Sequence, residues 1–150
     1  MTVPARLSPA AHRVAIAEVR EDVADASLCT KVVDDPAAGA VVSFSGVVRN
    51  HDEGRSVTEI EYVGHPDAAR ILAEVAADIA ARADVDAVAV QHRVGTLAVG
   101  DVALAAAVSA AHRAEAFAAC AELVNEVKRR LPVWKRQVFP DGSHEWTGSA

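Results

Sequence analysis

Two of the three lysines in the chain, Lys128 and Lys135, lie seven residues apart near the end of the segment AHRAEAFAACAELVNEVKRRLPVWKRQ. Together with Arg129, Arg130 and Arg136 they place five cations within nine residues. A lysine amine changes its protonation state readily when it is partly buried, so it can act as an acid, a base or a nucleophile. This basic cluster is therefore the first candidate site for chemistry.

A helix from about Arg113 to Arg130 is predicted to hold Lys128 near its carboxyl end. At about 100° per residue, eleven steps return Lys128 to within about 20° of Phe117, so its stem should lie along the core-facing stripe. Desolvation and the neighbouring Arg129 and Arg130 would then lower the pKa of this amine. The alternative is an ordinary cation that complements the helix dipole. The apolar residues that define the stripe are Phe117, Ala121, Val124 and Leu131.

The opposite end of the same helix carries His112 and Arg113, which together suit an oxyanion or a phosphate. Sixteen residues at about 1.5 Å rise place His112 about 24 Å from Lys128 along the helix axis. One straight helix cannot bring both residues to one small ligand. They either serve different sites, or a second copy of the chain brings its helix start to this helix end.

Arg49 is a further candidate for contact with an anion. It follows a predicted strand over residues 39–48 and begins the charged segment Arg49–Arg55, which has no apolar residue and is interpreted as a mobile surface loop. After the long helix, a strand over residues 133–138 should point Lys135 and Arg136 to opposite faces of a sheet.

The remaining elements predict an α+β fold in which helices pack on a mainly antiparallel sheet and a hairpin closes the chain. Asp25 should cap a short helix, and Pro66 should begin a second one with Leu72, Val75 and Ile79 in its buried stripe. A strand over residues 57–63 is expected to pair antiparallel with the strand before it. Gly95 and Gly100 suit a turn. The other predicted strands span residues 13–19, 87–94, 101–109 and 144–147.

Composition restricts the class of protein. The 150 residues, 51% of them apolar, should form one domain over 1–150 that folds unaided. The net charge of −6 argues against general nucleic-acid binding. No membrane span or signal peptide is predicted, so a cytoplasmic location is expected. Cys29, Cys120 and the histidines show no metal-ligand spacing, so no metal site is expected.

Four blocks of sequence, in order over residues 39–148, carry a resemblance to a known family. They are GAVVSFSGVVRNHDEG, HRVGTLAVGD, SAAHRAEAF and KRRLPVWKRQ with the later DGSHEW. Together they resemble the catalytic (large) subunit of molybdopterin synthase. The resemblance implies an α/β-hammerhead fold, a central homodimer and a small ubiquitin-like sulfur-carrier subunit at each end. The carrier's thiocarboxylated C-terminus would supply sulfur to cyclic pyranopterin monophosphate to form the dithiolene of molybdopterin, without any resident cofactor.

The resemblance also assigns residues. It implies that Lys128 and Lys135 are catalytic, and that His112 and Arg113 reach the site from the opposite subunit. Some members carry an acidic residue at the position of Gln137. The substrate-binding residues that it implies are Val47, Val48, Arg49, His112, Arg113, Lys128, Lys135, Arg136 and Gln137.

Two other functions remain open from the residues alone. A desolvated Lys128 suits Schiff-base chemistry with a carbonyl substrate. The basic cluster would also suit a non-catalytic module that binds an anion or an acidic peptide.

Overall fold

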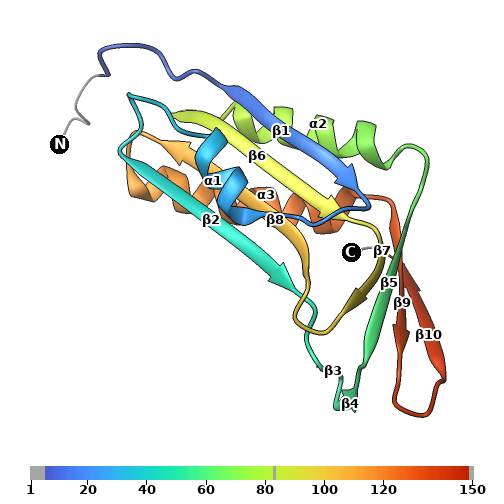
Figure 1. Cartoon of the computed structure of the whole chain (residues 1–150). Helices are drawn as coiled ribbons and strands as arrows, with labels where there is room; N and C mark the ends of the chain where they lie inside the picture. The colour runs from blue at the N-terminus through green and yellow to red at the C-terminus, as the bar shows by residue number, and fades with distance from the viewer. Residues whose placement is uncertain (1–5, 83, 149–150) are drawn as a thin grey trace.

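A four-stranded sheet in the order β1-β6-β8-β2 forms the body of the protein (Figure 1). The computed structural model describes residues 6–82 and 84–148, so residues 1–5, 83 and 149–150 of the expected domain lie outside the described residues. Strand β1 runs parallel to β6, and the other two pairs are antiparallel. The strands are β1 (Arg13–Arg20), β2 (Ala40–Val47), β6 (Val85–Arg93) and β8 (Val102–Ala110).

Helices cover both faces of this sheet. The helices α2 (Ala68–Ala80) and α3 (Arg113–Arg130) lie side by side on one face, and α1 (Ala26–Val32) lies on the other (Figure 1). Asp25 caps α1 by accepting hydrogen bonds from two backbone N–H groups, as expected. The larger core lies under α2 and α3, where fully buried side chains include Leu72, Val75, Ile79, Val88, Val90, Leu123 and Val127.

A second sheet extends from one end of the body as an arm (Figure 1). Its strand order is β10-β9-β5-β7, and every pair in it is antiparallel. A two-stranded hairpin, β3 (His51–Asp52) with β4 (Arg55–Ser56), lies next to it. The arm strands are β5 (Glu59–Gly64), β7 (Gly95–Ala98), β9 (Val133–Val138) and β10 (His144–Gly148).

This architecture confirms the predicted α+β, hammerhead-like class, with its mainly antiparallel strands, packed helices and C-terminal hairpin. The predicted pairing of residues 57–63 with the preceding strand is wrong. Strand β5 pairs with β7 and β9 in the arm, while β2 pairs with β8. The reason lies in the intervening hairpin, which closes on itself and lets the chain leave the body. Residues 95–98, expected within a turn, form strand β7 instead.

The buried face of α3 is rotated from the predicted stripe. Phe117 is 62% exposed, although it was expected in the core, and Ala121 is also exposed. The buried positions are instead taken by Ala116 and Cys120, each one residue before an expected core residue. These side chains are small because the helix lies close to the sheet. Val124 and Leu131 are buried, as expected.

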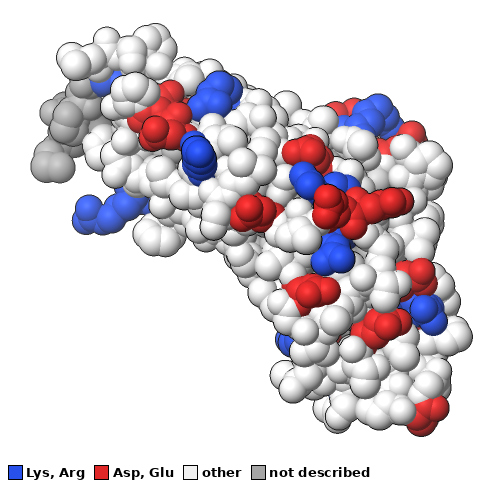
Figure 2. Space-filling view, in the orientation of Figure 1, with Lys and Arg blue, Asp and Glu red and all other residues white. Residues whose placement is uncertain are grey.

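Acidic and basic side chains are interspersed over the face shown in Figure 2. That face therefore offers no continuous basic surface for a long polyanion. Across residues 6–82 and 84–148, no helix combines the length and apolar character needed to cross a bilayer. The cytoplasmic location stays a prediction.

Candidate active site

A pocket of about 280 Å³ lies where the body meets the arm. Its walls come from the end of β2, the β3–β4 hairpin, β5, the end of α3 and β9. Six of the nine residues predicted from the sequence line it, namely Val47, Val48, Arg49, Lys128, Lys135 and Gln137. Five lining residues were not predicted from the sequence, namely His51, Asp52, Val57, Ile60 and Tyr62.

The register of the arm explains why Lys135 and Gln137 share this pocket. Gln137 lies opposite Ile60 and Lys135 lies opposite Tyr62 in the β5–β9 ladder, so all four side chains occupy one face. Arg136 points to the other face, as the alternation predicted. There its Nε donates a 2.9 Å hydrogen bond to Glu61 Oε1. Arg136 therefore does not line the pocket, and the substrate-binding role implied for it lacks this geometric support.

Arg49 is placed by a fixed backbone on either side of it. Val48 is buried, and its N–H donates to the Asp101 carbonyl while its carbonyl accepts from the Gly100 N–H. The segment Arg49–Arg55, interpreted as a mobile loop, contains most of the β3–β4 hairpin instead. Positive φ angles of 48° at Glu53 and 78° at Gly54 turn this hairpin tightly. The turn brings His51 and Asp52 back to the pocket.

The amine of Lys128 lies in a cationic environment. Its side chain reaches solvent at the mouth of the pocket. Partial burial, followed by the positive charges of Lys135 and Arg49, nevertheless lowers the pKa of Lys128 below its ordinary value of 10.5. The direction of this shift agrees with the sequence analysis, but two of the causes differ.

The predicted cause, repulsion from Arg129 and Arg130, is wrong because acidic partners hold both guanidinium groups elsewhere. Arg129 Nη2 lies 2.6 Å from Glu126 Oε2, and Arg130 Nη1 lies 2.7 Å from Asp78 Oδ2. Lys135 on β9 and Arg49, which follows β2, take their place.

Asp52 is the one carboxylate among the described residues that line this pocket. Its Oδ2 accepts a 2.9 Å hydrogen bond from Gln137 Nε2, and its Oδ1 accepts a 3.1 Å hydrogen bond from Arg49 Nη2. The Gln137 hydrogen bond is the main reason that the pKa of Asp52 falls below 3.8, with further contributions from Arg49 and Lys135. Asp52 is therefore ionised at neutral pH.

Behind the pocket, Tyr62 packs edge-on against His92, with ring centroids 5.1 Å apart. His92 is 1% exposed, and burial lowers its pKa to about 4, so its ring is neutral at pH 7. Burial also raises the pKa of Tyr62, which keeps the phenol protonated. This pair therefore forms a neutral wall of the site.

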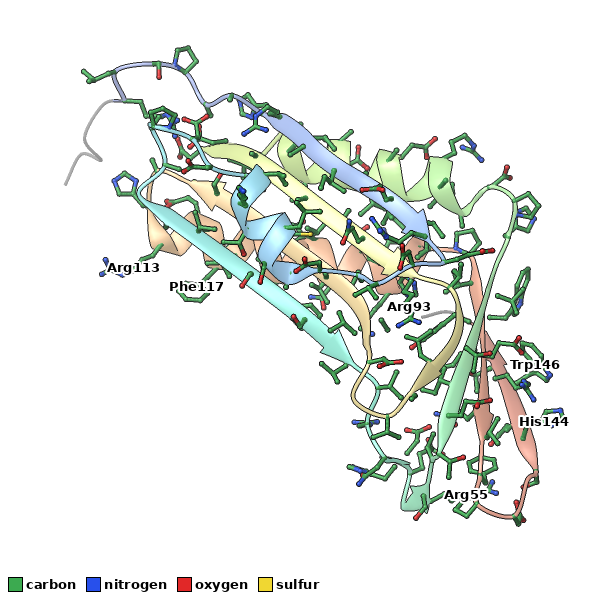
Figure 3. All side chains as sticks on the ribbon, viewed as in Figure 1. Arg55, Arg93, Arg113, Phe117, His144 and Trp146 are labelled. Carbon is green, nitrogen blue, oxygen red and sulfur yellow. The ribbon has the colours of Figure 1, made fainter. Side chains whose placement is uncertain are left out.

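His112 and Arg113 lie at the other end of the 18-residue helix α3. His112 lines a separate pocket of about 560 Å³ together with the N-terminal segment and the chain before β2. Figure 3 shows Arg113 and Phe117 projecting outward at this end, far from Arg55 on the hairpin. One chain therefore does not bring its own His112 and Arg113 to Lys128, as the length of the helix predicted.

No cluster of three potential metal ligands occurs in the described parts of the chain. Both cysteines are buried, and burial is the main cause that raises the pKa of each thiol, to about 11 for Cys29. The groups available for chemistry in this pocket are consequently amines, a guanidinium, an amide, an imidazole, a phenol and one carboxylate.

Comparisons with known proteins identify relatives of this chain. The family described as MoaE protein matches residues 18–130. A molybdopterin synthase catalytic subunit from Nostoc is 42% identical over 117 residues, which cover 77% of this chain and 71% of that protein. Another, from Neosartorya fischeri, is 35% identical over 146 residues, which cover 97% and 77% respectively.

Solved structures share the fold. Molybdopterin synthase from Staphylococcus aureus superposes with a TM-score of 0.80 at 28% identity, covering 87% of this chain and 96% of that one. A protein–protein complex of subunits 1 and 2 of the molybdopterin-converting factor from Helicobacter pylori contains a chain that superposes at 0.63. At 16% identity, with 89% of each chain covered, that likeness concerns the fold alone.

The fold, the lysine-bearing pocket and these matches define an enzyme of molybdenum cofactor biosynthesis. The chain belongs to the family of molybdopterin synthase catalytic subunits, and the resemblance found in the sequence is confirmed.

Proposed function

We propose that this chain transfers sulfur from the thiocarboxylated C-terminus of a small ubiquitin-like carrier to cyclic pyranopterin monophosphate. Two such transfers form the dithiolene of molybdopterin. The observation that carries the proposal is the convergence on one pocket of Arg49, which follows β2, with Lys128 of α3 and Lys135 of β9. Sulfur comes from the carrier, so the reaction needs no resident cofactor or metal.

The residue types match the charges that develop in such a reaction. The substrate's cyclic phosphate needs cationic donors, which Arg49 and the lysines supply. When the carrier's acyl carbon releases its sulfur, water adds to that carbon and an oxyanion forms, which a nearby ammonium group stabilises. Opening the cyclic phosphate requires a proton for the leaving oxygen, and a lysine of lowered pKa can give and regain that proton.

A homodimer with shared sites completes the proposal. The strand β2 is at the edge of the body sheet, and an apolar groove of about 340 Å³ runs between β2 and α3. Phe117 lines this groove and is 62% exposed, which favours burial against a partner. If two copies pack this flank about a twofold axis, the start of one α3 approaches the end of the other. His112 and Arg113 of each copy would then reach the pocket that holds Lys128 of its partner.

Two other functions predict different results at the same pocket. A Schiff-base enzyme would leave a reduced adduct on Lys128 after treatment with borohydride and substrate. A non-catalytic anion- or peptide-binding module would tolerate Lys128→Arg and Lys135→Arg, since charge is retained. Proton transfer would not tolerate these changes, because arginine stays protonated.

Reconstitution tests the proposal. The purified chain, mixed with thiocarboxylated carrier and cyclic pyranopterin monophosphate, should form molybdopterin and return the carrier with an ordinary carboxylate, as measured by mass spectrometry. A carrier with an unmodified carboxylate is the matched control and should give no product. Consumption of the pterin without loss of carrier sulfur would contradict the proposal.

A further inference from the structure

The backbone next to Arg49 is held by hydrogen bonds, but its side chain lies mostly in solvent. Its side chain is 67% exposed and follows the last residues of the edge strand β2. A long, exposed arginine loses considerable side-chain entropy when it is held in one orientation, so an anion site that uses it gains from a group that fixes it beforehand.

A chain of hydrogen bonds leads from the arm to this guanidinium. Gln137 is 4% exposed and sits within β9, between β5 and β10. Its amide fixes one oxygen of Asp52, and the other oxygen of Asp52 accepts from Arg49 Nη2. The buried amide thus locates the carboxylate, and the carboxylate locates the exposed guanidinium. Only one guanidinium nitrogen is engaged in this contact, so the others remain available to a ligand.

We propose that Asp52 is a positioning residue of this pocket, which holds Arg49 in the orientation that binds the phosphate of the substrate. This inference rests on the proposed function, in which Arg49 contacts the substrate's cyclic phosphate. Asp52 does not itself touch the anion, because a carboxylate and a phosphate repel each other.

The sign of the effect separates positioning from simple electrostatics. If Asp52 contributed only its negative charge, Asp52→Asn would make the pocket more positive and strengthen the binding of anions. If Asp52 orients Arg49, the same change should weaken binding, because a neutral amide holds a guanidinium less firmly than a carboxylate does. A weakening therefore cannot be explained by the lost charge alone.

The experiment uses inorganic phosphate as the probe and isothermal titration calorimetry on the full chain. Asp52→Asn should weaken phosphate binding about tenfold, as the loss of a charge-assisted hydrogen bond implies. In an Arg49→Ala background, Asp52→Asn should have little further effect, since Asp52 acts through Arg49. Gln137→Met, which removes the amide donor, should weaken binding in the same direction but less.

Glu53→Gln is the matched control. It removes a negative charge one residue away on the same hairpin, but Glu53 does not line the pocket, so phosphate binding should not weaken. Equal or tighter binding by Asp52→Asn, additive effects of Asp52→Asn and Arg49→Ala, or undetectable binding by the unaltered chain would each overturn the inference.

Activity gives a second readout that tests the two proposals separately. In the reconstituted reaction, Asp52→Asn should raise KM for the pterin substrate more than it lowers kcat. Weakened phosphate binding in a chain that forms no molybdopterin would support the role of Asp52 and contradict the proposed reaction. If the unaltered chain forms molybdopterin but Asp52→Asn changes neither KM nor phosphate binding, the proposed reaction is supported and the role of Asp52 is contradicted.

Discussion

Replacing Lys128 with alanine is expected to lower the rate of molybdopterin formation by about a thousandfold, within the range known for loss of a general acid or of a charge-stabilising donor. Lys128 reaches solvent at the pocket mouth and makes no ion pair within the described residues, so the change should leave the fold intact. The measurement is single-turnover product formation in the reconstituted system, with thermal unfolding to verify the fold.

Lys31→Ala is the control for this prediction, because Lys31 lies in α1 on the opposite face of the sheet. It should retain nearly full activity. A Lys128→Ala chain that is folded and turns over at close to the normal rate would refute a catalytic role for this amine.

Mixed dimers are expected to recover activity that neither parent has. A His112→Ala dimer lacks the imidazole at both sites, and a Lys128→Ala dimer lacks the amine at both. If each site takes Lys128 from one copy and His112 from the other, a mixed dimer holds one site with both changes and one intact site. Its activity should approach half that of the unaltered dimer, against a background about a thousandfold lower for the Lys128→Ala parent and about a hundredfold lower for the His112→Ala parent.

The mixed species must be isolated, for example with two different affinity tags, so that its activity is measured without either parent. A heterodimer that is verified by mass and stays as inactive as its parents would contradict the shared site. A mixture of two chains that both carry Lys128→Ala is the matched control and should show no recovery.

Local features of the site could be predicted from the sequence because they depend on residues close together in the chain. The periodicity of α3 placed Lys128 at its carboxyl end, and the alternation of β9 separated Lys135 from Arg136. The length of the same helix was enough to show that His112 and Lys128 of one chain cannot meet. Arg49 was found because it follows a strand and begins a charged segment.

The rest depends on contacts between segments far apart in the sequence. The pair of Arg130 with Asp78 on α2 could not be anticipated, although the i,i+3 spacing of Glu126 and Arg129 on one helix is visible in the sequence. The wrong cations were therefore expected to act on Lys128. Asp52 was missed because a charged hairpin resembles a solvated loop until the hydrogen bond between Asp52 and Gln137 is seen. Phe117 was placed in the core because periodicity identifies an apolar stripe but not which of its edges faces the sheet.

The titration of Lys128 itself tests most directly the claim that this pocket makes its amine chemically competent. With only three lysines in the chain, ¹³C-labelled lysine gives a resolvable NMR signal for each side chain. The pKa of Lys128 should lie below 10.5, and Lys135→Ala should raise it by removing a neighbouring positive charge. A pKa at or above 10.5, or one that does not respond to Lys135→Ala, would contradict the account.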